Sequence, residues 1–248
     1  MKKIYKRGFS FLTGHFWKRL IPKMFLDQNY FKFYIGKKLF HKAFQKNGKH
    51  YLTGRVLDVG SGSAPYKDDL PECRFITLEH DVRFQPMVVG SAVSLPFLSE
   101  AFNSVICTEV LEHLPEPEMC IIEIKRVLKG GGRVYITTPM TWYLHYEPND
   151  YFRFTPYGLR YLLEKNGFTV ITLEPIGGLA AILGMVAFEK FYNLIFKLAF
   201  FVPKAYRAIV VAHFTLPLSW VLYHLTSLLD HFSKRWVFSV CLVAEKRG

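Results

Sequence analysis

The sequence predicts an α/β fold, in which a mostly parallel sheet carries helices on both faces. Short β-rich runs alternate with helical patterns from about residue 52 to residue 176, which is typical of such a sheet. A glycine bend follows the first run, and an acidic residue ends the second. The chain has 248 residues, and 50% of them are hydrophobic, so we expect one core with additions.

The predicted elements follow one another with short connections. Strands are expected at residues 55–59, 74–79, 104–108, 133–138 and 169–173, with a last strand at 236–244. Helices are expected at 116–128 and 156–166. Thr155 and Pro156 suit the start of the second helix, and Gly167 suits its end.

Positive charge is concentrated at the start of the chain. Residues 1–50 contain 13 Lys and Arg and a single acid, which accounts for the net charge of +12. This basic, aromatic arm suits anionic lipid headgroups, and RNA is the rival partner. The four cysteines form no C-x-x-C pair, which argues against zinc and disulfides and fits a reducing, cytosolic compartment.

The most informative stretch is the bend at Gly60 and Gly62, after the strand at 55–59. Missing side chains there let the backbone approach a ligand closely. Glu79 ends the next strand, where a carboxylate accepts hydrogen bonds from ribose hydroxyls. A dinucleotide site would need a third glycine to seat pyrophosphate, but Pro65 takes that place. The pattern favours an adenosine cofactor, and a glycine turn that binds nothing is the alternative.

Together with later segments, this region resembles the class I S-adenosylmethionine (SAM)-dependent methyltransferases, with a Rossmann-like, type 11-like methyltransferase domain. The resemblance rests on residues 58–62, Glu79, and the segments 88–97, 102–117 and 126–139, in the family's order. It covers about residues 52–176 and the last strand. It implies a seven-stranded sheet whose final strand is inserted antiparallel.

The resemblance also implies the cofactor and its site. SAM would lie against Asp58, Gly60, Ser61, Gly62, Glu79, Ser91, Ala92 and Thr108. The family usually has an aspartate on the adenine side where this chain has Ser91, so a bond to adenine would lack charge assistance.

Candidate catalytic residues follow the fourth and fifth strands, because ligands of α/β sheets bind beyond the carboxyl ends of strands. They are Glu109, His113, His145 and Asp150, with His113 as the candidate base. For Asp150 the alternative is that it braces its loop together with Arg153.

A metal site is a further hypothesis. If residues 109–113 form a helical turn, Glu109, Glu112 and His113 share one face, and His145 would complete a site for Mg²⁺ or another divalent metal. The segment 109–113 resembles quinone-pathway O-methyltransferases and small-RNA 2′-O-methyltransferases, in which the equivalent residues bind metal. The alternative is that Glu112 and His113 only shape the pocket.

A hydrophobic insert, residues 177–234, precedes the last strand. Residues 208–229 lack Lys, Arg, Asp and Glu and are long enough to cross a bilayer, but Pro217 weakens that prediction. Residues 176–202 place their charges on one face, which favours an amphipathic helix in the membrane interface. The last strand must rejoin the sheet, so we expect the insert to lie in the membrane surface. The alternative is packing on a partner subunit or over a lipid-like substrate.

The chain therefore divides into an arm (1–50), a SAM-binding core (51–176), the insert (177–234) and a final strand with its tail (235–248). We expect SAM-dependent O-methylation of a lipid-linked, envelope-glycan or quinone-like acceptor. The protein would be peripheral or monotopic on the cytoplasmic, inner face of the membrane. RNA methylation and a non-catalytic SAM-binding membrane scaffold are the alternatives, and nucleic acid is not the expected partner because it leaves the insert unexplained.

Overall fold

The computed structural model describes residues 33–202, 204–230 and 235–248. Their contacts form two compact units, which we describe separately. One contains Leu39–Ile182 and Asp230–Gly248, and the described part of the other is 33–38 and Leu183–Leu229. Most of the basic arm, residues 1–32, lies outside the described residues.

The first unit contains a seven-stranded sheet, the strand count covering the described residues alone. The order is β3-β2-β1-β4-β5-β7-β6. The strands are β1 (Arg55–Val59), β2 (Arg74–Glu79), β3 (Val88–Val89), β4 (Phe102–Thr108), β5 (Leu128–Pro139), β6 (Phe168–Ile176) and β7 (Ser239–Lys246). The first five pair in parallel, whereas β7 is antiparallel to both β5 and β6. This confirms the predicted sheet and the antiparallel insertion of its last strand.

The predicted helices are also confirmed. They are α4 (Pro117–Val127) and α5 (Pro156–Lys165). Thr155 is the N-cap of α5, where its hydroxyl accepts a hydrogen bond from the Gly158 amide at 3.0 Å. Gly167 follows the helix with a φ of +81°, the left-handed conformation expected of a glycine at a helix end.

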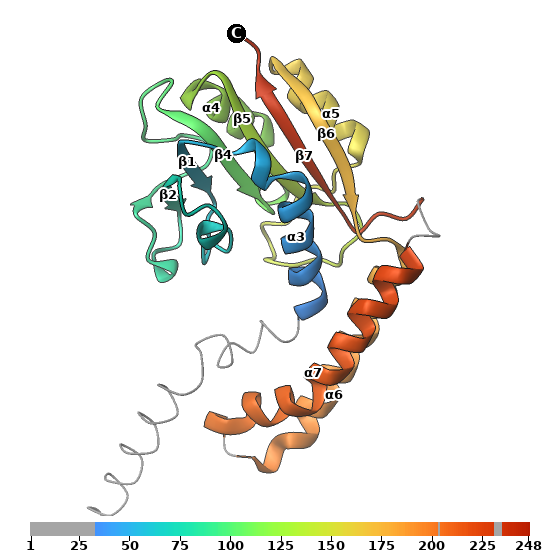
Figure 1. Ribbon diagram of the computed structural model, residues 1–248. Coiled ribbons are helices and arrows are strands. Elements are labelled where there is room, and N and C mark those ends of the chain that lie inside the picture. Colours follow the sequence, from blue (N-terminus) through green and yellow to red (C-terminus); the bar gives the residue numbers. More distant parts are fainter. Residues whose placement is uncertain (1–32, 203, 231–234) are drawn as a thin grey trace, which may run out of the picture. The chain divides into compact units, whose positions relative to one another are not determined.

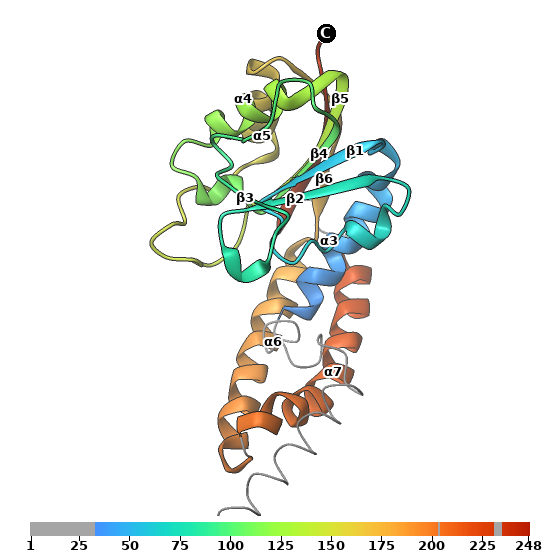
Figure 2. The same ribbon diagram turned by 90° about the vertical axis from the view of Figure 1, so that its left-hand side faces the viewer.

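Helices cover both faces of the sheet. In Figures 1 and 2, α4 and α5 lie on one face and α3 (Tyr34–Asn47) on the other. Phe44 of α3 is fully buried, with its ring 4.3 Å from that of Tyr66 and 5.3 Å from that of Tyr135 on β5. Residues 39–47 thus belong to the core unit rather than to an arm ending at residue 50. Their apolar side chains complete one face of the sheet.

The second unit is a helical hairpin. Its helices are α6 (Leu179–Leu198), followed by a 3₁₀ turn (Ala199–Phe201), and α7 (Lys204–Leu229). The two run side by side in both views (Figures 1 and 2), and a Cβ atom on Gly184 would lie 2.6 Å from Thr226. Pro217 lies inside α7, where it removes a backbone hydrogen bond, and α7 changes direction along its length.

One helical stretch among the described residues has the length and composition to cross a bilayer: Leu179–Phe201, with a mean hydropathy of 1.5. From the sequence, residues 208–229 were long enough to cross a bilayer but weakened by Pro217, and the apolar stretch among the described residues of α7 is Phe214–Leu229. Large apolar side chains are exposed on both helices and on the turn between them: Leu183, Val186, Leu194, Leu198, Phe200, Phe201, Phe214, Trp220, Val221, Leu225, Leu228 and Leu229.

Candidate active site

The site begins at the glycine bend after β1. Gly60 and Gly62 have φ values of +66° and +48°, a region that favours glycine. A Cβ atom on Gly60 would overlap the side chain of Val110, which follows β4. At Gly62 no atom lies within 4 Å of the position of a Cβ atom. Gly60 therefore serves close packing, while Gly62 borders open space.

Glu79, at the end of β2, faces this bend. Its Oε2 accepts a hydrogen bond from the Gly62 amide at 3.0 Å. Its Oε1 accepts from the amides of His80 and Asp81, at 2.8 and 3.2 Å. Glu79 is buried, so these donors fix the direction of its carboxylate. Among these bonds Oε2 receives only one, and it retains capacity for a ligand hydroxyl.

A cavity of about 440 Å³ opens beside these residues. It lies at the carboxyl ends of β1 and β4, where the strand order reverses and α/β sheets bind ligands. Five of the eight predicted cofactor residues line it: Gly60, Gly62, Glu79, Ser91 and Ala92.

The other three predicted cofactor residues are not among the lining residues. Asp58 and Ser61 are buried beneath the bend. The side chain of Thr108 hydrogen-bonds to Tyr66 instead. Burial, and secondarily the charge of Glu79, raise the pKa of Asp58 to about 8. Asp58 is therefore mostly protonated at neutral pH and lies next to the glycine bend without lining the cavity.

Several residues that line the cavity were not predicted from the sequence to be near the cofactor. They are Leu78, His80, Asp81, Arg83, Phe84, Gly90, Val110, Leu114, Tyr146 and Asn149. The lining residues that follow β2 could have been predicted from the sequence. They come directly after the ribose-binding acid Glu79 and therefore continue along the same edge of the sheet. Tyr146 and Asn149 lie after β5, next in sequence to the candidate catalytic residues His145 and Asp150.

Three of the four predicted metal ligands come together. Residues 111–113 form a 3₁₀ turn (Leu111–His113) rather than a longer helical turn. Ligand atoms of Glu112, His113 and His145 lie within 4.8 Å of one another. Glu109 does not share their face, because its φ of +54° breaks the turn, and its Oε1 accepts a hydrogen bond from Ser239 at 3.3 Å.

The carboxylates of this cluster have unusual environments. Glu112 is fully buried, and neither of its carboxylate oxygens has a hydrogen-bond partner among the described residues. Burial, followed by the charge of Glu109, raises the pKa of Glu112 well above its usual value. Burial also raises the pKa of Glu109 to about 7. Glu109 lines the cavity and can therefore change its charge near neutral pH.

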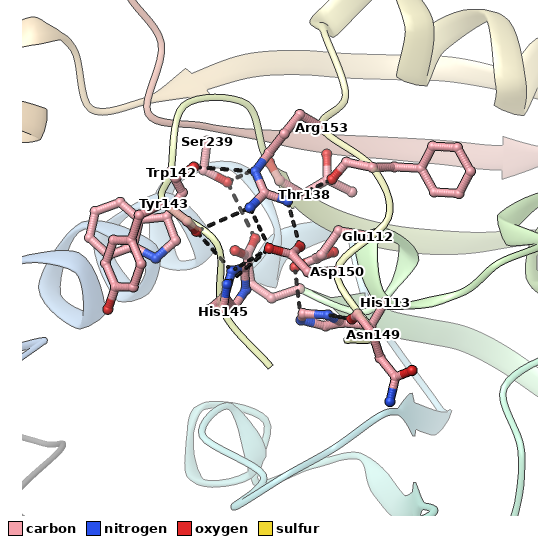
Figure 3. Close-up of polar contacts among 12 residues, drawn as sticks. Glu112, His113, Thr138, Trp142, Tyr143, His145, Asn149, Asp150, Arg153 and Ser239 are labelled. Atoms are coloured by element: carbon pink, nitrogen blue, oxygen red, sulfur yellow. Dashed lines mark hydrogen bonds and ion pairs between the residues drawn. The ribbon is translucent and has the colours of Figure 1, made fainter. Parts of the chain in front are cut away.

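The two imidazoles are held by backbone carbonyls (Figure 3). His113 Nδ1 lies 2.6 Å from the carbonyl oxygen of Asn149, and His145 Nδ1 lies 3.2 Å from that of Tyr143. A carbonyl only accepts, so each Nδ1 carries a proton and, in the neutral ring, each Nε2 carries a lone pair. His113 Nε2 lies 3.7 Å from Glu112 Oε1. Burial lowers the pKa of His145, which favours its neutral form.

Asp150 was a candidate catalytic residue, and the structure places it against Arg153. Arg153 donates to both of its carboxylate oxygens, at 2.6 and 2.7 Å. The side chain of Asp150 is 2% exposed and does not line the cavity. These bonds hold its pKa far below the usual value, so it stays ionised and is a poor base. The arrangement matches the alternative, in which the pair braces the loop.

Part of this unit is similar to a known protein family. Residues 57–136 match the family model described as a methyltransferase domain. These residues form a methyltransferase domain of the class I SAM-dependent kind. The methyltransferase fold extends well beyond the matched residues, because 85% of the chain superposes on 94% of a SAM-dependent methyltransferase from Archaeoglobus fulgidus, with a TM-score of 0.52 and 16% identity.

Curated relatives match part of the length of this chain. It is 27% identical over 164 residues to the tRNA (carboxymethyluridine(34)-5-O)-methyltransferase of Arabidopsis thaliana. It is 28% identical over 127 residues to a ubiquinone biosynthesis O-methyltransferase of Dechloromonas aromatica. These matches cover 54% and 44% of this chain, and 40% and 52% of those proteins. The chain thus spans about half the length of these relatives.

The cavity fits SAM. Open space beyond Gly62 leaves room for the backbone to approach a ligand, and the free capacity of Glu79 Oε2 suits a ribose hydroxyl. Ser91 and Ala92 lie at the same cavity, as an adenine-side segment would. Glu109 adds a carboxylate whose charge favours a sulfonium.

Proposed function

We propose that this protein transfers the methyl group of SAM to an oxygen atom of a lipid-linked, envelope-glycan or quinone-like acceptor at the cytoplasmic face of a membrane. The observation that carries the proposal is the shared cavity. Its lining includes both the Glu79 carboxylate at the glycine bend and the His113 imidazole. One half suits an adenosyl cofactor, and the other half offers a base.

His113 is the residue that we propose takes the acceptor's proton. Its Nδ1 donates to the carbonyl of Asn149, so its Nε2 lone pair is available. As the acceptor oxygen bonds to the methyl carbon, the carbon–sulfur bond breaks and its electron pair stays on sulfur. The products are the methylated acceptor and neutral S-adenosylhomocysteine, with the proton on His113. Much of the rate would come from alignment of oxygen, carbon and sulfur.

The proposal also includes a divalent metal ion bound in the site. Glu112, His113 and His145 would hold the ion, since they bring one carboxylate and two imidazoles within 4.8 Å of one another. The unpartnered carboxylate of Glu112 fits a cation, because a buried acceptor without a donor is costly. With the ion bound, the Nε2 lone pair of His113 would be on the metal, which would lower the pKa of an acceptor hydroxyl in place of His113 acting as the base. Titration calorimetry with MgCl₂ and MnCl₂ tests this, and heat that persists in Glu112→Gln and His145→Ala would contradict it.

Membrane contact is supported by the hairpin and by the charge of the arm. Phe200 and Phe201 are 76% and 77% exposed between α6 and α7, and Lys197 lies beside them. Exposed aromatic rings next to cations suit the interface of an anionic bilayer. Residues 1–50 add 13 cations that attract the same surface.

The acceptor is tested with labelled cofactor. Membranes incubated with the protein and methyl-labelled SAM should yield label that is extracted with lipid. Label confined to RNA would overturn the acceptor class and favour the RNA alternative, for which the Arabidopsis tRNA methyltransferase is a precedent. SAM binding by calorimetry without label in any fraction would favour the non-catalytic scaffold. His113→Ala should then bind SAM as the wild type does but lose transfer.

Membrane binding is tested by flotation with vesicles of phosphatidylglycerol or phosphatidylcholine. The double variant Phe200→Ser, Phe201→Ser should lose most of its binding to the anionic vesicles. Leu98→Ser is the matched control, because Leu98 is 83% exposed but lies in the core unit. Equal flotation of both variants would contradict the proposed role of the hairpin.

A further inference from the structure

We propose that the Asp150–Arg153 ion pair is a positioning device that sets the tautomer of both His113 and His145. The inference concerns residues that hold the imidazoles and do not touch the substrate. It rests on the proposed function only for its activity readout. The tautomers themselves can be observed without any turnover.

The pair reaches His145 by two routes (Figure 3). The Asp150 Oδ2 atom accepts a hydrogen bond from the His145 amide at 2.9 Å, which fixes the backbone of that residue. Arg153 Nη2 donates at 3.1 Å to the carbonyl of Tyr143, the same carbonyl that His145 Nδ1 approaches. The guanidinium therefore orients the acceptor that keeps the proton on Nδ1 of His145.

The pair reaches His113 through the chain on either side of Asp150. One residue before it, the carbonyl of Asn149 receives the Nδ1 proton of His113. One residue after it, the amide of Tyr151 donates at 2.8 Å to the carbonyl of Glu112, next to His113 in sequence. Two hydrogen bonds thus connect the loop that carries Asn149 to the turn that carries His113. Asp150 lies between the two loop residues, Asn149 and Tyr151, that make these bonds.

The burial and the hydrogen bonds of the ion pair restrict its geometry. Asp150 is 2% exposed and Arg153 24% exposed, and the fork of Arg153 also donates at 2.8 Å to the carbonyl of Phe152. A planar guanidinium that makes several hydrogen bonds fixes the direction of its partners as well as their distance, whereas an ammonium group fixes only the distance. In the neutral form of an imidazole, the partner of one nitrogen decides the role of the other. Fixing both carbonyls therefore aims two Nε2 lone pairs toward Glu112 and the cavity.

The test replaces Asp150 by asparagine, which keeps its size, in the full-length protein. Nitrogen-15 NMR of labelled histidines should show a protonated Nδ1 for both residues in the wild type. Asp150→Asn should shift at least one of them toward the Nε2-protonated tautomer. The maximal rate of methyl transfer should fall at least tenfold while the KM for SAM changes less than threefold. Glu164→Gln is the control, because it breaks the exposed Arg160–Glu164 pair on α5 and should change neither readout.

Wild-type histidines protonated on Nε2 would overturn the inference, as would unchanged tautomers in folded Asp150→Asn. If that variant does not fold, Arg153→Lys gives the same decision, because it keeps the charge and loses the fork. A tautomer shift in a protein that transfers no methyl group would refute the proposed function and leave the positioning role supported.

Discussion

A Cβ atom on Gly60 would overlap Cγ2 of Val110, so the bend after β1 and the residue that follows β4 are in direct contact. Gly60 also has a φ of +66°. Gly60→Ala therefore combines a clash with backbone strain, and we expect it to lower the free energy of unfolding by roughly 2–4 kcal/mol. Urea denaturation checks this. An unfolding midpoint within error of the wild type would contradict the contact.

Gly62→Ala should behave differently, because no neighbouring atom of the described residues lies within 4 Å of the added methyl group. Its φ of +48° costs only about 1 kcal/mol in stability. The methyl group would however enter the space that we assign to the cofactor, so the Kd for SAM should rise at least tenfold. Calorimetry on this folded variant measures it. Unchanged affinity would place the cofactor elsewhere.

Glu79→Gln should weaken SAM binding by about 10- to 100-fold, because a hydrogen bond to a charged group contributes about 1.5–3 kcal/mol and Glu79 Oε2 has capacity for a ribose hydroxyl. Glu72→Gln, at an exposed position just before β2, is the matched control and should bind as the wild type does. The Kd by calorimetry decides. If both variants bind equally well, Glu79 does not hold the ribose.

The pKa of Asp58, raised to about 8 by burial and by Glu79, predicts a pH dependence of stability. Because the pKa is higher in the folded state than in the unfolded chain, the folded state binds the extra proton. The stabilisation is present at acidic pH and is lost as pH rises through about 8. The wild type should therefore lose roughly 2–5 kcal/mol relative to Asp58→Asn between pH 5 and pH 9. Denaturation of both proteins at several pH values measures the difference, and a constant difference would refute the prediction.

The pKa of Glu109, raised to about 7 by burial, predicts that the cavity distinguishes SAM from its product by pH. Ionised Glu109 attracts the positive sulfonium of SAM but not the neutral thioether of S-adenosylhomocysteine. The preference for SAM should rise several-fold from pH 6 to pH 8. Glu109→Gln should show no such rise. Competition binding at both pH values tests it, and parallel pH profiles in the two proteins would count against Glu109.

Much of the fold could be predicted from the sequence, because buried strands and helix ends have local signatures. The bounds of β1 and β2 were predicted to the residue, and Thr155 caps α5 as expected. β3 was missed because two residues carry no periodicity. The place of α3 was missed because closely spaced cations masked the few apolar residues that pack on the sheet.

The candidate site was less accessible from sequence. Glycines and a terminal acid mark the cofactor half, since their spacing reflects the backbone. The orientation of Glu109 depends on a positive φ that a glutamate rarely adopts, so a helical turn was the natural expectation. The hydrogen-bond partners of the two imidazoles are backbone carbonyls. Every residue has a carbonyl, so the sequence does not indicate which ones the imidazoles bind.

The strands that flank the hairpin are neighbours in the sheet. Ile176, which ends β6, is the register partner of Ser239, which begins β7. Asp230 also accepts hydrogen bonds from the amides of Gly178 and Ala181, so the two exits of the chain are tied together. Closing a longer connection between points already side by side adds little entropy cost. This connection could therefore be lengthened, shortened or exchanged without disturbing the sheet and the cavity at its edge.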